Sequence, residues 1–188
     1  MKVAIFGGTF DPIHEAHLSV AREAADRLHL DRILFVTAGH PPHKPEAATT
    51  PFEHRHHMVE LACRRDPRFI PSAIDNGPGK SYSIETIEKV KAELQPCDQL
   101  FFLIGADAFA EIHSWYRSED VLKSVEFIVV SRPGYEYPVP EGAKIHRLET
   151  LDLPVSSSTI RQQLEVGAVP KELPAEVADY ALQHQLYA

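Results

Sequence analysis

The chain of 188 residues contains only two cysteines, Cys63 and Cys97, and they do not form a C-x-x-C pair. This count excludes a disulfide-rich scaffold, and two cysteines outside a C-x-x-C pair argue against a zinc knuckle, so we interpret both thiols as reduced packing residues. No window approaches the roughly 20 apolar residues that cross a membrane. The first strand-like segment follows Met1-Lys2 directly, without an apolar leader. We therefore expect a cytoplasmic protein with no membrane association.

Positive charge is also scarce. The sequence has 19 Lys and Arg residues against 27 Asp and Glu residues, a formal net charge of -8. A protein that tracks a nucleic-acid backbone needs a basic stripe, and this chain has none, so we expect no nucleic-acid partner. With 44% hydrophobic and 24% charged residues, the chain is typical of one globular domain, which we expect over residues 1–188.

Apolar stretches and helical periodicities alternate along the chain. We expect strands near 2–6, 32–37, 68–74, 99–104, 126–131 and 144–148. We expect helices near 17–29, 53–64, 83–94, 158–165 and 175–186, the last two being C-terminal helices that begin at about 158. This order predicts an α/β, Rossmann-like fold with an open, mainly parallel sheet and helices on both faces, which binds ligands beyond the carboxyl ends of its strands.

The richest segment lies at the amino end, where the apolar residues 3–6 are followed by Gly7-Gly8 and then by His14 and His17. We expect the glycines to form a turn whose amides can approach a phosphate. Two histidines three residues apart at a helix start can point the same way, beside unpaired amides that favour an anion. Structural histidines and a metal site are the alternatives, but His-x-x-His supplies only two of the four ligands of a closed zinc site.

The run Gly7-Gly8-Thr9-Phe10-Asp11-Pro12-Ile13-His14-Glu15-Ala16-His17 is similar to the signature of the nucleotidyltransferases with a His-x-Gly-His motif, and most resembles their bacterial nicotinate-mononucleotide adenylyltransferases. Similar blocks follow in the family's order at 41–44, 81–83, 105–107, 115 and 155–161. The resemblance implies that ATP and nicotinate mononucleotide are joined to give deamido-NAD and pyrophosphate in NAD biosynthesis. Transfer would be direct and in line, without a covalent enzyme intermediate, and Mg²⁺ would accompany ATP. Ala16 replaces the motif glycine, and its methyl group could crowd the base or ribose.

The resemblance also implies the site residues. Catalytic residues would be His14 and His17, which contact the phosphates in the transition state, and Lys44 and Arg161, which contact the leaving pyrophosphate. The ATP-binding set comprises Gly7, Gly8, Thr9, Phe10, His17, Gly105, Asp107, Ser157, Ser158 and Arg161. The set for nicotinate mononucleotide comprises Thr9, His43, Lys44, Ser81, Tyr82, Ser83, Thr86 and Trp115. No residue is assigned as a protein ligand of a metal.

Several of these residues also have ordinary structural explanations. Lys44 could be a solvated loop lysine, residues 156–159 are a good helix cap, Asp107 could cap a helix and Trp115 could be core packing. We also interpret the cluster at 54–57, which contains three histidines, as solvated side chains.

Alternatives for the whole protein stay open. Phosphopantetheine adenylyltransferases and cytidylyltransferases belong to the same superfamily, although Trp115 and residues 41–44 disfavour them. A fragment of a class I aminoacyl-tRNA synthetase would need a Lys-Met-Ser-Lys-Ser loop, which is absent. A catalytically silent nucleotide sensor is the non-enzymatic alternative. The preference for nicotinate over nicotinamide, the oligomeric state, loop closure, and the role of Arg132 in substrate binding or folding are not determined by the sequence.

Overall fold

A computed structural model describes residues 1–41, 49–150 and 155–188. Six parallel strands form one sheet in the order β3-β2-β1-β4-β5-β6. Their bounds are β1 Lys2–Gly8, β2 Arg32–Thr37, β3 Phe69–Ser72, β4 Gln99–Gly105, β5 Glu126–Ser131 and β6 Ile145–Glu149. This is the doubly wound Rossmann order, so the predicted fold class is confirmed. The order reverses between β1 and β4, and the carboxyl ends of these two strands flank the expected binding crevice.

Helices cover both faces of the sheet. Their bounds are α1 Glu15–Leu28, α2 Phe52–Cys63, α3 Ser83–Glu93, α4 Ala106–Ala110, α5 Ser118–Ser124, α6 Ser157–Glu165 and α7 Ala175–Gln183, with a 3-10 turn, η2, at Ile112–Ser114. The sequence prediction missed α4, η2 and α5. Each is too short for a helical periodicity to stand out, and the sheet, not the local sequence, supports them.

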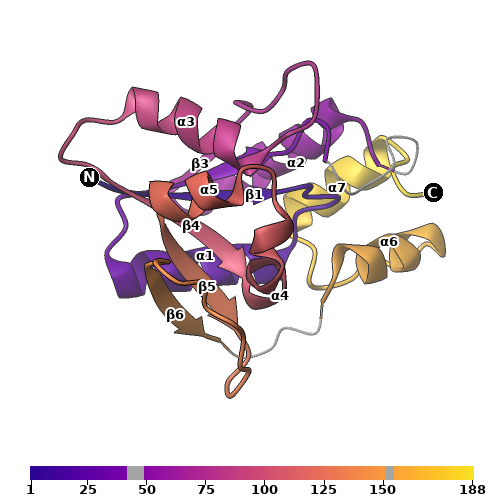
Figure 1. The fold of residues 1–188 in the computed structure, drawn as a ribbon. Helices are drawn as coiled ribbons and strands as arrows, with labels where there is room; N and C mark the ends of the chain where they lie inside the picture. Colours follow the sequence, from indigo (N-terminus) through magenta and orange to yellow (C-terminus); the bar gives the residue numbers. More distant parts are fainter. Residues whose placement is uncertain (42–48, 151–154) are drawn as a thin grey trace.

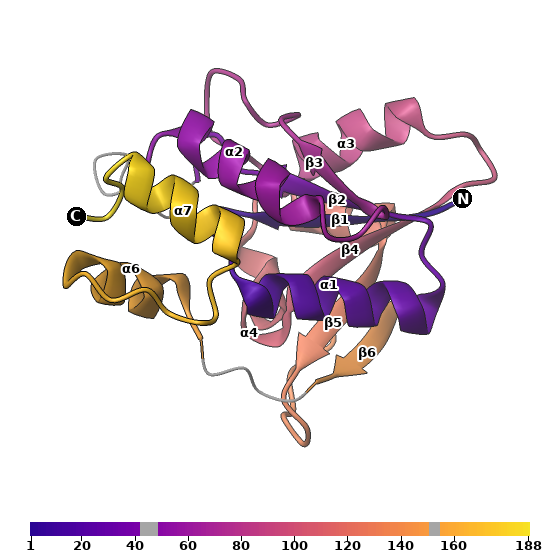
Figure 2. The same ribbon diagram turned by 180° about the vertical axis from the view of Figure 1, so that it is seen from behind.

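Two hydrophobic cores cover the two faces of the sheet, and the alternation along β1 shows how the chain builds them. Ala4 points into one core with residues of α1, α2, α6 and α7. Val3 and Ile5 point into the other core with residues of α3, α4 and α5. Figure 1 shows α3, α4 and α5 on the side of the sheet nearer the viewer. Figure 2 shows the opposite face, where α1, α2 and α7 lie in front of the sheet. Both faces are therefore covered, as a parallel sheet requires.

Two details of the amino-terminal motif differ from the sequence prediction. Gly7 and Gly8 are not a turn: they are the last residues of β1 and pair with Val36 and Thr37 of β2. The two glycines belong to the strand because β2 pairs with β1 up to Gly8, the last residue of β1. Helix α1 begins at Glu15, two residues earlier than expected, with His14 as its N-cap in an extended conformation.

Smaller boundary differences occur elsewhere. β3 is confined to residues 69–72 of the expected 68–74, and the last helix ends at Gln183 instead of near 186. In the part of the chain that the structure describes, no helix combines the length and apolar character needed to cross a membrane.

Candidate active site

The site is built around the carboxyl ends of β1 and β4, where Gly8 and Gly105 lie. A Cβ atom on Gly8 would come within 2.9 Å of the Phe10 ring, so the chain needs glycine there. Phe10 itself adopts a left-handed backbone conformation, with φ at 48°, and its ring is buried against Phe6 and His17. Since this ring belongs to the core, any contact of Phe10 with a nucleotide would come from its backbone.

His14 and His17 lie together at the amino end of α1, as the sequence predicts. Their rings stack with centroids 3.8 Å apart. The His14 backbone N–H donates to His17 Nδ1 at 3.2 Å, which satisfies one of the unpaired amides at the helix start. Because Nδ1 accepts this bond, the Nε2 atom of a neutral His17 carries the proton and is a hydrogen-bond donor.

Both imidazoles are shifted toward the neutral form. Burial lowers the pKa of His14 to about 4. Burial, together with the neighbouring His14, holds the pKa of His17 well below its usual value. His14 Nδ1 is buried and has no hydrogen-bond partner among residues 1–41, 49–150 and 155–188. At neutral pH both imidazoles are therefore neutral, and His14 Nδ1 is a buried polar atom without a partner in the described part of the chain.

The loop that joins β1 to α1 is held by the carboxyl-terminal helices. Arg161 Nη1 donates to the Asp11 carbonyl oxygen at 2.7 Å, and Arg161 Nη2 donates to Ser158 Oγ at 3.3 Å. Ser157 Oγ donates to the Pro12 carbonyl oxygen at 3.0 Å. The cap of α6 is Ser156, whose Oγ accepts from the Thr159 amide at 3.2 Å. The structure thus brings Ser157, Ser158 and Arg161 to the histidine loop, 145 residues away in sequence.

A cavity of about 430 Å³ opens beside α1, and we call it the Ala16 cavity. It is lined by Ala16 and Val20 of α1, by Gly105, Ala106 and Asp107 after β4, and by Val130, Ser131, Arg132, Tyr135 and Thr150. The Tyr135 hydroxyl donates to Asp107 Oδ1 at 2.8 Å across this cavity's lining. The predicted residues Gly105 and Asp107 therefore meet Ala16, the residue that departs from the family motif.

A second hollow lies on the other side of the β1 end and consists of an inner pocket of about 230 Å³ and an outer pocket of about 830 Å³. Both pockets are lined by Gly7, Gly8, Ala38, Ser81, Ser83, Ala108 and Trp115, and we call them together the Trp115 cavity. Thr9 and Tyr82 line the outer pocket. The Trp115 ring packs edge-on against Phe102 and is partly exposed. The predicted residues Thr9, Ser81, Tyr82, Ser83 and Trp115 are thus brought together.

Thr86 lies in the same inner pocket but is buried, and its hydroxyl is engaged. Thr86 Oγ1 donates to Asp75 at 2.8 Å from each carboxylate oxygen. Burial raises the pKa of Asp75. The Thr86 hydroxyl therefore holds the Asp75 carboxyl group in place. The sequence did not predict this contact, because Asp75 lies on a separate loop.

Three further residues at the site were missed by the sequence analysis. Arg55 is buried on α2, Asp75 lines the Trp115 cavity, and Tyr187 donates to Asp11 Oδ1 at 2.7 Å. Arg55 stands within the cluster at 54–57 that was interpreted as solvated. His54 bonds the Tyr180 hydroxyl at 2.9 Å and His56 bonds the Thr37 hydroxyl at 3.2 Å. The interpretation as solvated side chains is therefore wrong for these two histidines and for the buried Arg55. Only the tertiary packing of α2 against the sheet and α7 distinguishes such residues from solvated ones.

Two predicted residues, His43 and Lys44, lie outside the described residues. Among the residues that are described, no three His, Cys, Asp or Glu side chains gather as a set of metal ligands. Mg²⁺ commonly binds through one or two carboxylates and substrate phosphates rather than in an all-protein cage. The side chains present are thus compatible with a metal ion that arrives with a nucleotide.

Comparison with known proteins agrees with this geometry. The family model described as cytidylyltransferase-like matches residues 5–163. A "probable nicotinate-nucleotide adenylyltransferase" of Solibacter usitatus is 54% identical over 187 residues, covering 100% of both chains. A protein of the same name from Thermus thermophilus is 40% identical over 192 residues, again covering 100% of both chains.

Among solved structures, a nicotinic acid mononucleotide adenylyltransferase of Plasmodium falciparum complexed with NaAD has a similar fold. Its TM-score is 0.81 at 22% identity, with 99% of this chain and 97% of that chain covered. At this identity the likeness supports the fold, whereas the full-length relatives carry the family assignment. The chain therefore belongs to the nicotinate-nucleotide adenylyltransferase family of the cytidylyltransferase-like proteins.

Proposed function

We propose that this protein transfers the adenylyl group of ATP to nicotinate mononucleotide, which yields deamido-NAD and pyrophosphate in NAD biosynthesis. The relatives named above carry this activity in their names, and the Plasmodium falciparum structure holds NaAD. One observation in the structure supports the proposal most directly: the Ala16 cavity and the inner pocket of the Trp115 cavity share Gly105 in their linings. Two nucleotides could therefore meet at the carboxyl end of β4.

We assign ATP to the Ala16 cavity and nicotinate mononucleotide to the Trp115 cavity. Asp107 in the Ala16 cavity offers carboxylate oxygens to ribose hydroxyls, provided that a ligand shares or replaces the Tyr135 contact. Trp115 in the Trp115 cavity offers an aromatic face to a pyridine ring, and Ser81 and Ser83 offer polar groups beside it. His43 and Lys44, which belong to the same proposal, are expected to reach the nucleotides from the 38–51 loop.

The proposed reaction is a direct displacement at phosphorus. A phosphate oxygen of nicotinate mononucleotide attacks the α-phosphorus of ATP, the bond from that phosphorus to the bridging oxygen breaks, and pyrophosphate leaves with the electron pair.

His17 donates a hydrogen bond from Nε2 and His14 contributes a second contact as charge moves onto the phosphate oxygens. Arg161 and Lys44 stabilise the leaving pyrophosphate. Mg²⁺ bound to the ATP phosphates would neutralise part of their charge. Positioning and electrostatic stabilisation are the main sources of rate in such transfers, so no residue need act as a nucleophile.

The surroundings of the site fit small anionic nucleotides better than a polymer. The protein has a formal net charge of -8, and the basic groups proposed here are confined to one loop and one helix. We therefore propose nucleotides, not nucleic acids, as its partners, and a cytoplasmic location in which ATP is available.

The test is a measurement of pyrophosphate release with MgATP or MgCTP, each combined with nicotinate mononucleotide, nicotinamide mononucleotide or phosphopantetheine. We expect release with MgATP and nicotinate mononucleotide. Release only with phosphopantetheine or only with CTP would assign the protein to another branch of the superfamily. Nucleotide binding without release in any combination would support a sensor and contradict the proposal.

A further inference from the structure

Arg55 is an arginine in the interior of the protein that the proposed chemistry does not use. It lies on α2, and only 2% of its surface is exposed. Burial lowers the pKa of Arg55, and this is partly offset by the nearby Asp11 carboxylate, which favours the charged form. An arginine keeps its proton even under such conditions, so a permanent positive charge lies beneath the site.

The guanidinium donates to four backbone carbonyl oxygens. Nη1 reaches the carbonyls of Thr9 and Ala38, each at 2.8 Å. Nη2 reaches the carbonyl of Gly39 at 3.3 Å, and Nε reaches that of Thr50 at 2.7 Å. Thr9 follows β1, Ala38 and Gly39 follow β2, and Thr50 precedes α2. One side chain therefore connects the three segments that leave two neighbouring strands and enter a helix.

Two of these four carbonyl residues line the Trp115 cavity, whereas Gly39 and Thr50, with Arg55 itself, line a neighbouring cavity of about 640 Å³. Thr9 and Ala38 line the outer pocket of the Trp115 cavity, and Ala38 also lines the inner pocket. None of the four carbonyl residues is part of the Ala16 cavity lining. The guanidinium thus holds the backbone of Thr9 and Ala38 on one side of the Trp115 cavity.

The neighbouring backbone leaves little room for adjustment. A Cβ atom on Gly39 would come within 2.4 Å of the Asp75 carbonyl oxygen, so the segment after β2 lies directly against the loop that carries Asp75. Movement of Gly39 would therefore be passed to Asp75, which lines the inner pocket. The segment that Arg55 holds is therefore packed between the guanidinium and the loop that carries Asp75.

We propose that Arg55 is a positioning residue that sets the shape of the Trp115 cavity and thereby the affinity for the acceptor nucleotide. The identity of the acceptor rests on the function proposed above. Lysine cannot replace arginine in this role, because a single ammonium nitrogen cannot span carbonyls arranged around a planar fork.

The first experiment uses Arg55→Lys and measures acceptor binding without turnover. Trp115 is the single tryptophan of the chain and lines the cavity, so its fluorescence reports nicotinate mononucleotide directly. We expect Kd for nicotinate mononucleotide to rise at least tenfold. In steady-state kinetics, KM for nicotinate mononucleotide should rise by a similar factor while KM for ATP stays within twofold.

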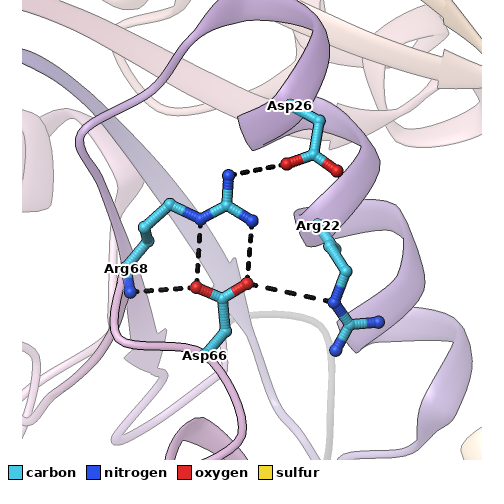
Figure 3. A network of polar contacts seen from close by, with 4 residues as sticks. All are labelled: Arg22, Asp26, Asp66 and Arg68. Atoms are coloured by element: carbon cyan, nitrogen blue, oxygen red, sulfur yellow. Dashed lines mark hydrogen bonds and ion pairs between the residues drawn. The ribbon is translucent and has the colours of Figure 1, made fainter.

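Arg68→Lys is the matched control. Arg68 donates to Asp66 and Asp26 in a polar network with Arg22, shown in Figure 3. It directly precedes β3, at the amino ends of the strands and away from the cavities. Arg68→Lys should change stability without changing Kd for the acceptor. A purely structural role for Arg55 would give the same pattern in Arg55→Lys.

A second variant, Arg55→Ala, tests the same proposal by chemical rescue. Addition of guanidinium at millimolar concentrations should restore part of the affinity for nicotinate mononucleotide, whereas methylammonium should not. Unchanged acceptor affinity in a folded Arg55→Lys, or variants that fail to fold and are not rescued by guanidinium, would overturn the proposal.

Wild-type activity separates this proposal from the proposed function. If wild-type protein does not release pyrophosphate with nicotinate mononucleotide, the proposed function fails. If it does and Arg55→Lys behaves as wild type, only the positioning role fails.

Discussion

The hydroxyl of Tyr187 donates a hydrogen bond to Oδ1 of Asp11 at 2.7 Å, which joins positions 176 residues apart. The other carboxylate oxygen of Asp11, Oδ2, accepts from the Thr50 amide at 3.3 Å. Burial, and then the negative charge of Asp11, raise the pKa of Tyr187, so the phenol stays protonated as a donor. The last residues of the chain therefore fix the loop that carries the two histidines.

We expect Tyr187→Phe to lower the free energy of unfolding by about 1.5–3 kcal/mol, because a buried carboxylate loses a charge-assisted hydrogen bond. Tyr180→Phe is the control. The Tyr180 hydroxyl shares a hydrogen bond with His54 Nδ1 at 2.9 Å in which no carboxylate takes part, and its loss should cost about 0.5–1.5 kcal/mol. Urea unfolding of both variants measures the difference. Equal losses would show that the charge on Asp11 contributes nothing to this contact.

Stability should depend on pH through His14. The pKa of His14 is lowered to about 4 in the folded protein, against a usual value of 6.5, so below pH 6.5 the unfolded chain binds more protons than the folded chain. The resulting loss in the free energy of unfolding is absent above pH 6.5, grows as the pH falls toward 4 and reaches about 3 kcal/mol at most.

Unfolding free energies of wild type and His14→Gln between pH 7.5 and 4.5 test this prediction. Glutamine does not titrate, so the variant should lose less stability over that range than wild type does. Parallel pH profiles would show that the protonation of His14 is not coupled to folding.

His17→Asn should lower kcat by about 10²–10³, the effect of removing one donor that stabilises developing negative charge. Asparagine keeps an acceptor for the His14 amide but has no donor at the position of Nε2. His17→Gln, whose amide can reach that position, should retain more activity than His17→Asn. Steady-state rates combined with thermal unfolding separate the two effects, and near-native turnover in His17→Asn would remove His17 from the mechanism.

Ala16→Val should raise KM for ATP several-fold, because added methyl groups would narrow the Ala16 cavity, and it should leave KM for nicotinate mononucleotide unchanged. Valine also lowers helix propensity, by less than about 0.7 kcal/mol. Ala16→Gly, which restores the family motif, should lower KM for ATP if the methyl group crowds the nucleotide. A change confined to the acceptor KM would contradict the assignment of ATP to this cavity.

Much of the fold could be predicted from the sequence because each strand carries its own apolar run and each long helix its own periodicity. The alternation also predicts that Gly8, Gly105 and Ser157 meet at one edge of the sheet, since carboxyl ends of parallel strands lie together. Contacts such as Asp75 with Thr86, or Arg55 with Thr9, could not be predicted in this way. They depend on where separate loops come to rest, and no local pattern records that.

Burial was the other property that the sequence did not disclose. An arginine flanked by histidines is typical of a solvated helix face, yet Arg55 is buried, and the Phe10 ring belongs to the core instead of facing a nucleotide. Both follow from the packing of α2 and the β1–α1 loop onto the same hydrophobic face of the sheet. Side-chain direction at loop ends is set by tertiary contacts, and short-range spacing does not determine it.

If the two cavities hold ATP and nicotinate mononucleotide side by side for direct transfer, the identity and amount of product will show it. Reaction mixtures with MgATP and nicotinate mononucleotide would be separated by chromatography and identified by mass. Direct transfer should give deamido-NAD and pyrophosphate in equal amounts, with no free AMP. Pyrophosphate accompanied by AMP instead of deamido-NAD would show that water, not an acceptor nucleotide, reaches the α-phosphorus, and would rule out direct transfer.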